Sequence, residues 1–230
     1  MKINKEQIKG LNPNSNLMKL YKKSLISLSI EQKEASIGLM LGDASLQTQN
    51  KGKNYRLKFE WSNKNKTYLD HVFNLYSEWV LTEPHKKVRI SPNNNEIINW
   101  GFQTISHDAF NFLADLFLVN TRKSIPNNLI LDYLTPRGLA YWFMDDGGKL
   151  DYNKNSKNRS VVLNTHSFTE SEVKMMTEEL SIKFKLDCSN RKNKGKDIII
   201  INSGSFDQFY CYIKPYMIEE MNSKLPLQEI

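Results

Sequence analysis

The sequence predicts a mixed α/β (α+β) fold built from two similar halves, and three observations support this prediction. Two apolar runs, residues 35–45 and 138–148, each close on an aspartate among small residues. These aspartates are Asp43 and Asp146, and the patterns that follow them recur in the same order. Near the end of each half, a lysine is followed within three residues by a proline. Repetition at almost one spacing indicates an internal duplication.

The two apolar runs carry the signals that start and end helices. The first helix is expected to begin at Ser29, with Gln32 completing a capping box, and to end at Gly42. The second is expected to have Thr135 as its N-cap and Pro136 at its first helical position. Both helices therefore finish at their aspartates.

Strand-like and helix-like segments follow each apolar helix. In residues 54–61, large apolar side chains alternate with polar ones, which is typical of a strand with one buried face. A second helical pattern in the chain opens with the capping box formed by Thr169 and Glu172. The recurring pairs are 54–61 with 159–168, 66–80 with 169–184, and 96–117 with 197–216. For each half, the sequence thus predicts a helix, then strands, then a second helix, and finally a strand, a turn and a third helix.

The predicted join between the halves lies at residues 121–134, where a proline and two asparagines interrupt the patterns. We expect a first half with an N-terminal extension over residues 1–120 and a second half over residues 135–230. Because the two halves differ in sequence, any paired ligand site that they build together is expected to be asymmetric.

Composition narrows the class of protein. The chain has 230 residues, with Lys+Arg 32 against Asp+Glu 25, a net charge of +7 and a pI near 9.2. This balance favours a polyanionic partner. The two cysteines, Cys188 and Cys211, fit neither a disulfide framework nor a zinc site.

The sequence contains none of the features of a membrane or export signal. Its apolar stretches are too short for a membrane span, and its start has no signal-peptide core or import pattern. We therefore expect a soluble protein without a membrane partner, made in the compartment where it works. Heavy use of Asn, Lys and Ile fits an AT-rich organelle genome.

A carboxylate at a helix C-terminus faces the negative end of the macrodipole, which costs about 0.3–1 kcal/mol at an exposed site. Asp43 and Asp146 repeat this arrangement, so a compensating cation is expected. Gly38 and Gly42 would let the two helices approach closely, bringing both acids to one end. Hard oxygen ligands of this kind suit Mg²⁺. A core helix that ends in an ordinary turn is the alternative for either motif alone.

The segments SIGLMLGDA (36–44) and LAYWFMDDG (139–147) resemble the two motifs of the LAGLIDADG homing endonuclease family in its single-chain, two-repeat form. The segments FMDDGGK, YNKNS, SIPNN, PNSNL, PHKK and KLP extend the likeness over nearly the whole chain, and it is greatest to the omega-intron type of yeast mitochondria. The sequence departs from the family pattern at Ser36, Gly42, Ala44 and Tyr141. Tyr141 replaces the glycine of close helix contact.

The resemblance implies two pseudo-symmetric αββαββα units, with the motif helices at a central interface and two antiparallel sheets shaped like a saddle. It implies a monomer, encoded in and acting in mitochondria, that cleaves double-stranded DNA at a long asymmetric target, leaves short 3′ overhangs and promotes intron mobility. Asp43 and Asp146 would be the catalytic ligands of Mg²⁺, for which Mn²⁺ would substitute. Lys123 and Lys224 would assist the chemistry, one per strand. The role of Asp145 stays open between support of the ligands and mere tolerance.

Residues for DNA recognition follow from the strand pattern and from the basic loops. Alternation places Arg56, Lys58 and Asn54 on one face of a strand suited to the major groove, and Asn164 and Thr165 are the counterparts in the second half. Loops 85–89, 149–159 and 190–196 are expected to contact phosphates and flanking bases. Their candidate residues are Lys86, Lys87, Arg89, Lys149, Tyr152, Asn153, Lys154, Lys157, Arg159, Arg191, Lys192 and Lys194.

The alternative function is an RNA maturase that binds intron RNA and helps its own intron to splice. Acids in both motifs and both lysines favour retained cleavage, because a protein that only binds RNA has no need of them. A nuclease with an E-x-K signature fits less well, since neither match, at Glu31 or at Glu172, lies in a strand pattern. The histidines are scattered without a metal-binding spacing.

Overall fold

The structure is a computed structural model of the chain, and it describes residues 3–12, 15–153 and 157–226. Contacts divide the chain into two compact units. The first unit comprises Met1–Gln32 and Ala44–Ala114, and the second comprises Lys33–Asp43 and Asp115–Ile230. Most of the first motif helix, α2 (Ile30–Leu41), therefore packs in the second unit. The predicted join at 121–134 concerns the sequence repeat, which need not coincide with a division by packing, and it stays a prediction.

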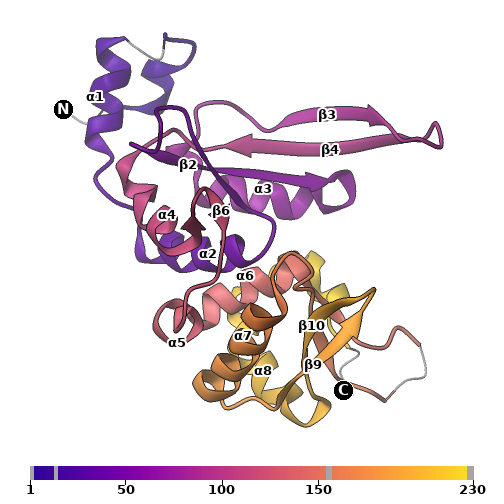
Figure 1. The fold of residues 1–230 in the computed structure, drawn as a ribbon. Coiled ribbons are helices and arrows are strands. Elements are labelled where there is room, and N and C mark those ends of the chain that lie inside the picture. The colour runs from indigo at the N-terminus through magenta and orange to yellow at the C-terminus, as the bar shows by residue number, and fades with distance from the viewer. Residues whose placement is uncertain (1–2, 13–14, 154–156, 227–230) are drawn as a thin grey trace. The chain divides into compact units, whose positions relative to one another are not determined.

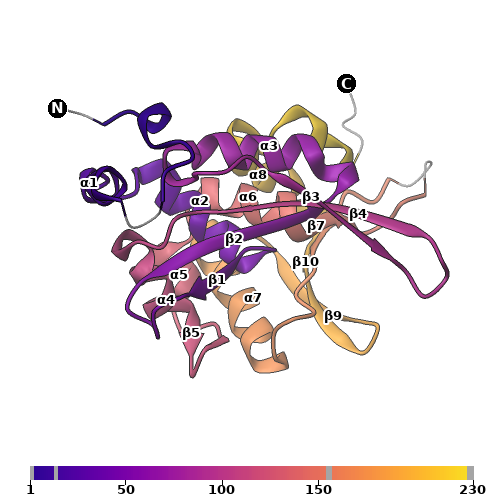
Figure 2. The same cartoon turned by 90° about the horizontal axis from the view of Figure 1, so that it is seen from above.

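The first unit is built on a four-stranded antiparallel sheet in the order β1-β2-β4-β3. Its strands are β1 (Ser45–Thr48), β2 (Tyr55–Ser62), β3 (His85–Ile90) and β4 (Glu96–Gln103). Helix α3 (Lys66–Leu75) covers one face, and the β3–β4 hairpin extends beyond the end of that helix (Figures 1 and 2). Phe59 of β2 packs against Phe102 of β4 in a tilted arrangement, with ring centroids 4.8 Å apart, and these rings form part of an aromatic core between sheet and helix.

The N-terminal extension packs onto the first unit through a small core of its own. It contains a 3₁₀ helix, η1 (Lys5–Ile8), and α1 (Asn16–Ser24), whose residues Ile8, Met18 and Tyr21 are buried together. The hydroxyl of Tyr21 donates to the carbonyl oxygen of Glu78 at 2.5 Å. The extension is thereby fixed to the segment that follows α3.

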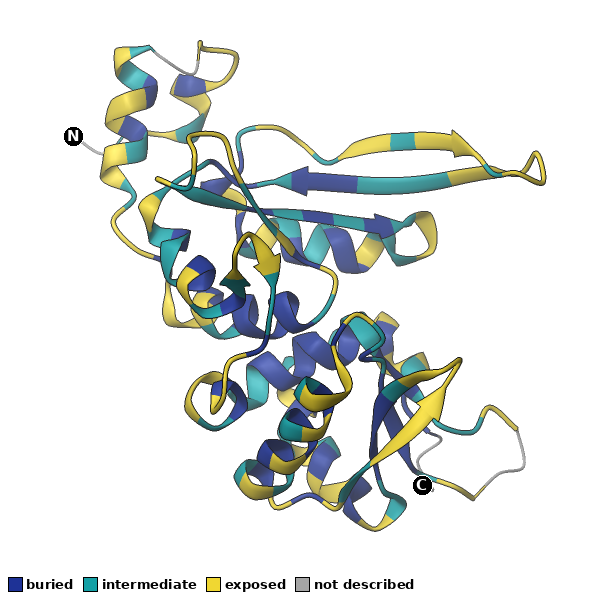
Figure 3. Cartoon of the chain, in the orientation of Figure 1, coloured by how far each residue is buried: buried dark blue, intermediate teal, exposed yellow. Residues whose placement is uncertain are grey.

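The second unit repeats the sheet topology in the order β7-β8-β10-β9. Its strands are β7 (Gly147–Lys149), β8 (Val161–Leu163), β9 (Cys188–Asn193) and β10 (Lys196–Ile201). Its helices are α5 (Leu129–Tyr133), α6 (Pro136–Asp146), α7 (Glu170–Phe184) and α8 (Phe206–Ile213). Figure 3 shows α6 buried along most of its length and β9 exposed.

The remaining elements are short. Helix α4 (Asn111–Phe117) leads into the two-residue strands β5 (Leu118–Val119) and β6 (Arg122–Lys123), which form a hairpin. The other 3₁₀ helices are η2 (Asn63–Asn65), η3 (Ser77–Trp79), η4 (Asp108–Phe110), η5 (Ser203–Ser205), η6 (Lys214–Tyr216) and η7 (Glu219–Lys224). In the part of the chain that the structure describes, no helix is both long enough and apolar enough to cross a membrane.

The predicted fold class is confirmed, because each half has the element order αββαββα. The capping boxes at Ser29 and Thr169 and the N-cap at Thr135 are also confirmed. Two predictions of local structure were wrong. Segments 85–89 and 190–196, expected as loops, form the strand β3 and the β9–β10 hairpin. Exposed, Lys-rich strands lack the apolar alternation that identifies a strand in sequence.

Candidate active site and nucleic-acid interface

The two motif helices, α2 and α6, approach each other through glycines. A Cβ atom at Gly38 would lie 1.9 Å from the carbonyl oxygen of Gly138, so only glycine fits there. The expected close approach at Gly38 is thus confirmed, and the partner backbone belongs to Gly138. Tyr141 lies one turn further along α6 and is buried, so the loss of glycine at that position does not separate the helices.

The acids of the two motifs lie at neighbouring helix ends. Asp43 follows α2 and is exposed, whereas Asp146 is the last residue of α6 and is partly buried. The backbone N–H of Asp43 donates to Oδ2 of Asp145 at 3.1 Å. A Cβ atom at Gly42 would lie 2.4 Å from the same oxygen, so a side chain at position 42 would displace that of Asp145. Asp145 therefore joins the end of the first motif to α6.

Asp43 and Asp146 are close enough to interact electrostatically. The pKa of Asp146 is raised from 3.8 to about 7, first by burial and then by the negative charge of Asp43. The positive charges of Lys123 and Lys224 lower the pKa of Asp146 and so partly offset this rise. Two interacting carboxylates ionise together only when nearby positive charge compensates them. Additional positive charge at this site would therefore favour the ionised form of Asp146.

Both predicted lysines cap the motif helices. Nζ of Lys123 donates to the carbonyl oxygen of Gly42 at 3.0 Å, at the end of α2. Nζ of Lys224 donates to the carbonyl oxygens of Met144 and Asp145 at 2.5 and 2.7 Å, at the end of α6. Burial lowers the pKa of Lys123, while the three aspartates raise it. A lysine thus lies at the C-terminal end of each motif helix, Lys123 from the β5–β6 hairpin and Lys224 from η7.

The residue types at this site fit Mg²⁺. Among the described residues, no cluster of three or more His, Cys, Asp or Glu side chains could hold a metal ion. Dedicated all-protein cages are unusual for Mg²⁺, which is commonly held by one or two carboxylates, with water and substrate phosphates completing the octahedron. Asp43 and Asp146 supply that number of carboxylates, and a phosphate would have to complete the site.

Asn164 and Thr165, the pair predicted to contact DNA in the second half, have different environments in the structure. The backbone N–H and Nδ2 of Asn164 both donate to the carbonyl oxygen of Asp146, at 2.9 and 2.8 Å. Thr165 is fully buried, and its hydroxyl donates to the carbonyl oxygen of Asp197 at 2.8 Å. Thr165 is thus not presented to DNA, because β8 ends at Leu163 and the chain turns inward. Asn164 instead holds the backbone of Asp146 at the end of α6, a contact that the sequence did not indicate.

In the first half, the residues predicted to read DNA lie on a polar face of the sheet, and their contact with DNA stays a prediction. Arg56 and Lys58 lie on the side of β2 opposite its buried aromatic residues, and Nη2 of Arg56 donates to Oε1 of Gln47 at 3.1 Å. Asn54 lies in the turn before β2 rather than on the strand. Asn99 and Gln103 share this face through the strand register, which sequence reasoning could not supply.

A charged network crosses the same face. The carboxylate of Glu60 accepts from Nδ2 of Asn99 at 3.0 Å and from Nζ of Lys87 at 2.5 Å. These hydrogen bonds hold the pKa of Glu60 below its usual value. Arg89 lies on the face of β3 that carries Lys87. Lys86 pairs with Trp100 and lies on the opposite face, the side covered by α3.

The loop from β7 to β8 contributes an exposed group of predicted contacts. Tyr152, Asn153 and Lys157 are exposed, and Lys149 is half-buried at the end of β7. Arg159 forms an ion pair with Asp207 and stacks over the ring of Phe206 at 4.6 Å, so it is already engaged within the protein. Lys154 lies outside the described residues.

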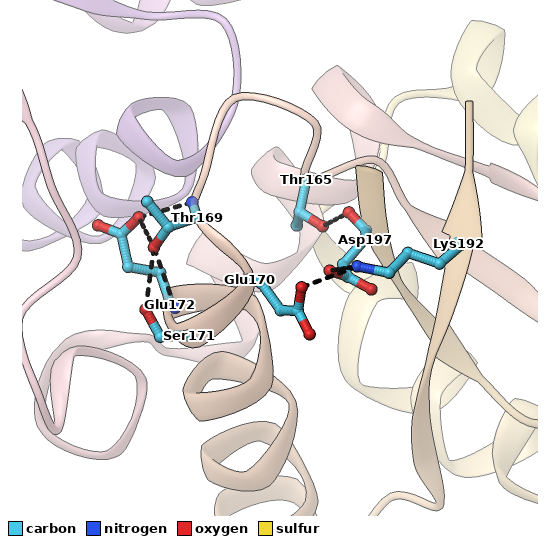
Figure 4. Close-up of polar contacts among 7 residues, drawn as sticks. All are labelled: Thr165, Thr169, Glu170, Ser171, Glu172, Lys192 and Asp197. Atoms are coloured by element: carbon cyan, nitrogen blue, oxygen red, sulfur yellow. Dashed lines mark hydrogen bonds and ion pairs between the residues drawn. The ribbon is translucent and has the colours of Figure 1, made fainter. Parts of the chain in front are cut away.

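The β9–β10 hairpin carries the last group of predicted contacts. Arg191 and Lys194 are exposed. Nζ of Lys192 bonds to carboxylate oxygens of Asp197 at 2.6 Å and Glu170 at 2.9 Å, as Figure 4 shows. The exposed side chains of Arg191 and Lys194 are therefore better placed to contact DNA than that of Lys192, which is already paired with two carboxylates.

The two sheets differ on the face away from the helices. In the second sheet, Val162, Ile198 and Ile200 form an apolar cluster against which Leu150 of the β7–β8 loop packs. The corresponding face of the first sheet carries Arg56, Lys58 and Glu60. The second half thus offers loop and hairpin side chains for contact, rather than a polar strand face.

Known proteins resemble this chain over most of its length. The family model described as LAGLIDADG DNA endonuclease family matches residues 33–209. A probable intron-encoded endonuclease 1 of Wickerhamomyces canadensis is 45% identical over 223 residues, 97% of this chain and 96% of that protein. The cytochrome b mRNA maturase bI2 of Debaryomyces hansenii is 30% identical over 215 residues, 86% of this chain and 74% of that protein.

A solved structure extends the likeness to three dimensions. The homing endonuclease I-WcaI, bound to its DNA recognition sequence, superposes with a TM-score of 0.94 at 44% identity, covering 99% of this chain and 100% of that chain. The family match spans well over half of the sequence and includes all of α6, all but the first three residues of α2, and both motif aspartates. This chain belongs to the LAGLIDADG DNA endonuclease family.

Proposed function

We propose that this protein is an intron-encoded homing endonuclease that binds a specific double-stranded DNA sequence and hydrolyses one phosphodiester bond in each strand. One observation carries the proposal: two acids end neighbouring helices, and a lysine from each half donates to the end of one of those helices. A purely structural helix pair needs no such concentration of paired charge. The similarity to I-WcaI supports the same conclusion.

The chain's own residues account for positioning and charge in this reaction. Asp43 and Asp146 would hold Mg²⁺, or Mn²⁺ in its place, which when bound polarises the scissile phosphates and helps to form the attacking hydroxide. Asn164 holds the backbone of Asp146, and Asp145 holds the backbone of Asp43. Lys123 has three N–H donors, one of which is given to Gly42, so the same ammonium group can also meet a phosphate oxygen or water.

Several finer features belong to the same proposal. The target is long and asymmetric because the halves differ, and cleavage across the minor groove leaves short 3′ overhangs that promote intron mobility. The protein acts as a monomer in mitochondria and is encoded there, as its Asn-, Lys- and Ile-rich composition supports. The assignment to the omega-intron type rests on the motif likeness described for the sequence.

A maturase function is the second candidate, supported by the similarity to the cytochrome b mRNA maturase bI2. The presence of both acids and both lysines favours cleavage, because RNA binding alone does not require them. A splicing assay with the host intron distinguishes the two. Splicing without any DNA cleavage would favour the maturase.

The test of the proposal uses a DNA library randomised around the I-WcaI recognition sequence, with Mg²⁺ as the added metal. We expect the wild-type protein to select a cleaved duplex, and Asp43→Asn or Asp146→Asn to lose cleavage of that duplex by at least about 1000-fold while specific binding stays. Absence of cleavage by the wild type, or cleavage by both variants at close to the wild-type rate, would contradict the proposal.

A further inference from the structure

We propose that Phe168 and Glu172, where the chain enters α7, are positioning residues for Lys123 and so control the cleavage of one DNA strand. The inference rests on the proposed function, in which Lys123 serves one strand and Lys224 the other. The sequence predicts a helix cap at Glu172 and no role for Phe168, so neither is predicted as a site residue.

Lys123 lies on a support that is weak by itself. It pairs with Leu118 in the β5–β6 hairpin, whose strands are two residues long. The turn is formed by Asn120 and Thr121, both with positive φ. A two-stranded hairpin alone is marginally stable, so it cannot fix an ammonium group to within a fraction of an ångström. The position of Lys123 must be set by what surrounds it.

Glu172 anchors the backbone directly after Lys123. Its Oε1 accepts from the backbone N–H of Ile125 at 2.8 Å, and the hydroxyl of Ser124 also bonds to its carboxylate. Its Oε2 accepts from the backbone N–H of Thr169 at 2.8 Å, closing the capping box of α7 (Figure 4). One carboxylate therefore ties the first turn of a long helix to the two residues that follow Lys123.

Phe168 supports the other end of the lysine. Nζ of Lys123 lies 5.6 Å from the centroid of the Phe168 ring, within the range of a cation–π contact. Phe168 is 5% exposed, and its backbone N–H donates to the carbonyl oxygen of Thr165 at 3.0 Å. Thr165 is in turn bonded to Asp197 of β10, as Figure 4 shows. The backbone of Phe168 is thus linked through Thr165 to the second sheet.

The same segment also holds the acid of the second motif. It begins at Asn164, which donates twice to the carbonyl oxygen of Asp146, and it ends at Glu172. Residues 164–172 therefore set the position of Lys123 relative to Asp146. A displacement of about 1 Å, even from a change remote from the chemistry, can lower a rate on the order of 100-fold. Lys224 enters from η7, so its strand depends on other contacts.

The experiment measures single-turnover cleavage of each strand separately, on a selected duplex with a different label on each strand and with Mg²⁺ present. The test variants are Phe168→Leu and Glu172→Gln. Ile125 and Thr169 donate to different oxygens of Glu172, and glutamine replaces one of these oxygens with an NH₂ group that cannot accept, so one of the two hydrogen bonds is lost. The reference variants are Lys123→Met and Lys224→Met. Two matched controls lie on α7: Phe184→Leu removes a buried ring at the far end of the helix, and Glu178→Gln removes an exposed charge.

We expect each test variant to slow, by about tenfold, the strand that Lys123→Met slows, and to leave the other strand within about twofold; tenfold corresponds to about 1.4 kcal/mol. Nicked DNA should accumulate, while the dissociation constant for DNA stays unchanged. The controls should leave the ratio of the two strand rates unchanged, even if Phe184→Leu lowers the unfolding temperature.

Equal slowing of both strands by the test variants, or no slowing, would overturn the positioning role while leaving the proposed function intact. If Lys123→Met cleaves both strands at the wild-type rate, or slows both equally, Lys123 does not serve one strand. That outcome would overturn the present inference as well.

Discussion

At the scale of single residues, the adjacent acids Asp145 and Asp146 have different roles in the site. Asp145 and Asp146 are neighbours in the sequence, yet Asp145 accepts a hydrogen bond from the backbone of Asp43 while Asp146 is raised in pKa by burial and by Asp43. The sequence left the role of Asp145 open because a contact between helix ends depends on how closely the helices pack. The structure gives Asp145 an orienting contact.

The first prediction separates orientation from metal binding at position 145. Asparagine keeps an oxygen that can accept from the N–H of Asp43, whereas alanine does not. We expect Asp145→Asn to cleave within about threefold of the wild type and Asp145→Ala to be slower by about tenfold, since one lost hydrogen bond is worth about 1 kcal/mol. Cleavage rates at saturating Mg²⁺ give the comparison. If Asp145→Asn is inactive, the charge itself is required and Asp145 acts as a ligand.

The second prediction concerns stability and pH without metal. The pKa of Asp146 is raised from 3.8 to about 7, so its contribution to stability is fully present below about pH 4 and is lost as the pH rises toward 7. Relative to Asp146→Asn, the wild type should lose free energy of unfolding across this window and level off above it. Each pKa unit is worth about 1.4 kcal/mol before solvent screening reduces it.

Urea unfolding in EDTA from pH 4 to 8 measures that difference, and added Mg²⁺ should reduce it, because the ion binds the native carboxylate. If the difference in free energy of unfolding between the two proteins is independent of pH, the native surroundings of Asp146 do not raise its pKa.

At the scale of elements, the contact between α2 and α6 sets the geometry of the site. The carbonyl oxygen of Gly138 occupies the space that a side chain at Gly38 would need. Alanine is normally favoured over glycine inside a helix by about 1 kcal/mol. Here the helices would have to separate, and the acids at their ends would move with them.

The third prediction is therefore that Gly38→Ala lowers the free energy of unfolding by about 1–3 kcal/mol, as overpacked cores do, and reduces cleavage more than binding. Gly204→Ala is the matched control, since a Cβ atom there meets nothing within 4 Å. Chemical unfolding of both variants measures the effect. A Gly38→Ala protein as stable and as active as the Gly204→Ala protein would contradict the close-contact account.

Elements were predictable from sequence to the extent that their signals are local. The caps at Ser29, Thr135 and Thr169 involve residues three positions apart, so they could be recognised directly. The sequence predicts loops at 85–89 and 190–196 because Lys, Arg and Asn are frequent in both segments, and the strands β3 and β9 that form there are exposed for most of their length. The burial of Thr165 depends on a turn after β8, and the contact of Asp145 depends on helix packing, which are both non-local.

At the scale of the whole molecule, the two halves share a topology but present different surfaces. The first sheet exposes a polar face with Arg56 and Lys58, while the second sheet has an apolar cluster covered by Leu150. We therefore expect base discrimination to rely on strand side chains in the half-site read by the first half. In the other half-site, loop and hairpin residues such as Arg191 should contribute mainly through phosphates.

The fourth prediction compares Arg56→Ala with Arg191→Ala. Arg56→Ala should relax base preference at one or two positions, at about 1–3 kcal/mol each, whereas Arg191→Ala should weaken binding to all sequences and reduce the salt slope by about 1. Cleavage of a randomised library and binding at several salt concentrations measure these effects. Relaxed base preference in Arg191→Ala, with none in Arg56→Ala, would reverse the assignment.

The central claim is that the acidic ends of two closely packed helices share divalent ions over a DNA backbone. A crystal structure of the protein with its selected duplex and Mn²⁺, located by anomalous scattering, tests it directly. We predict Mn²⁺ at coordination distance, about 2.1–2.2 Å, from carboxylate oxygens of both Asp43 and Asp146 and from phosphate oxygens. Mn²⁺ bound elsewhere, or to neither of these carboxylates in a complex that cleaves on soaking, would contradict the account.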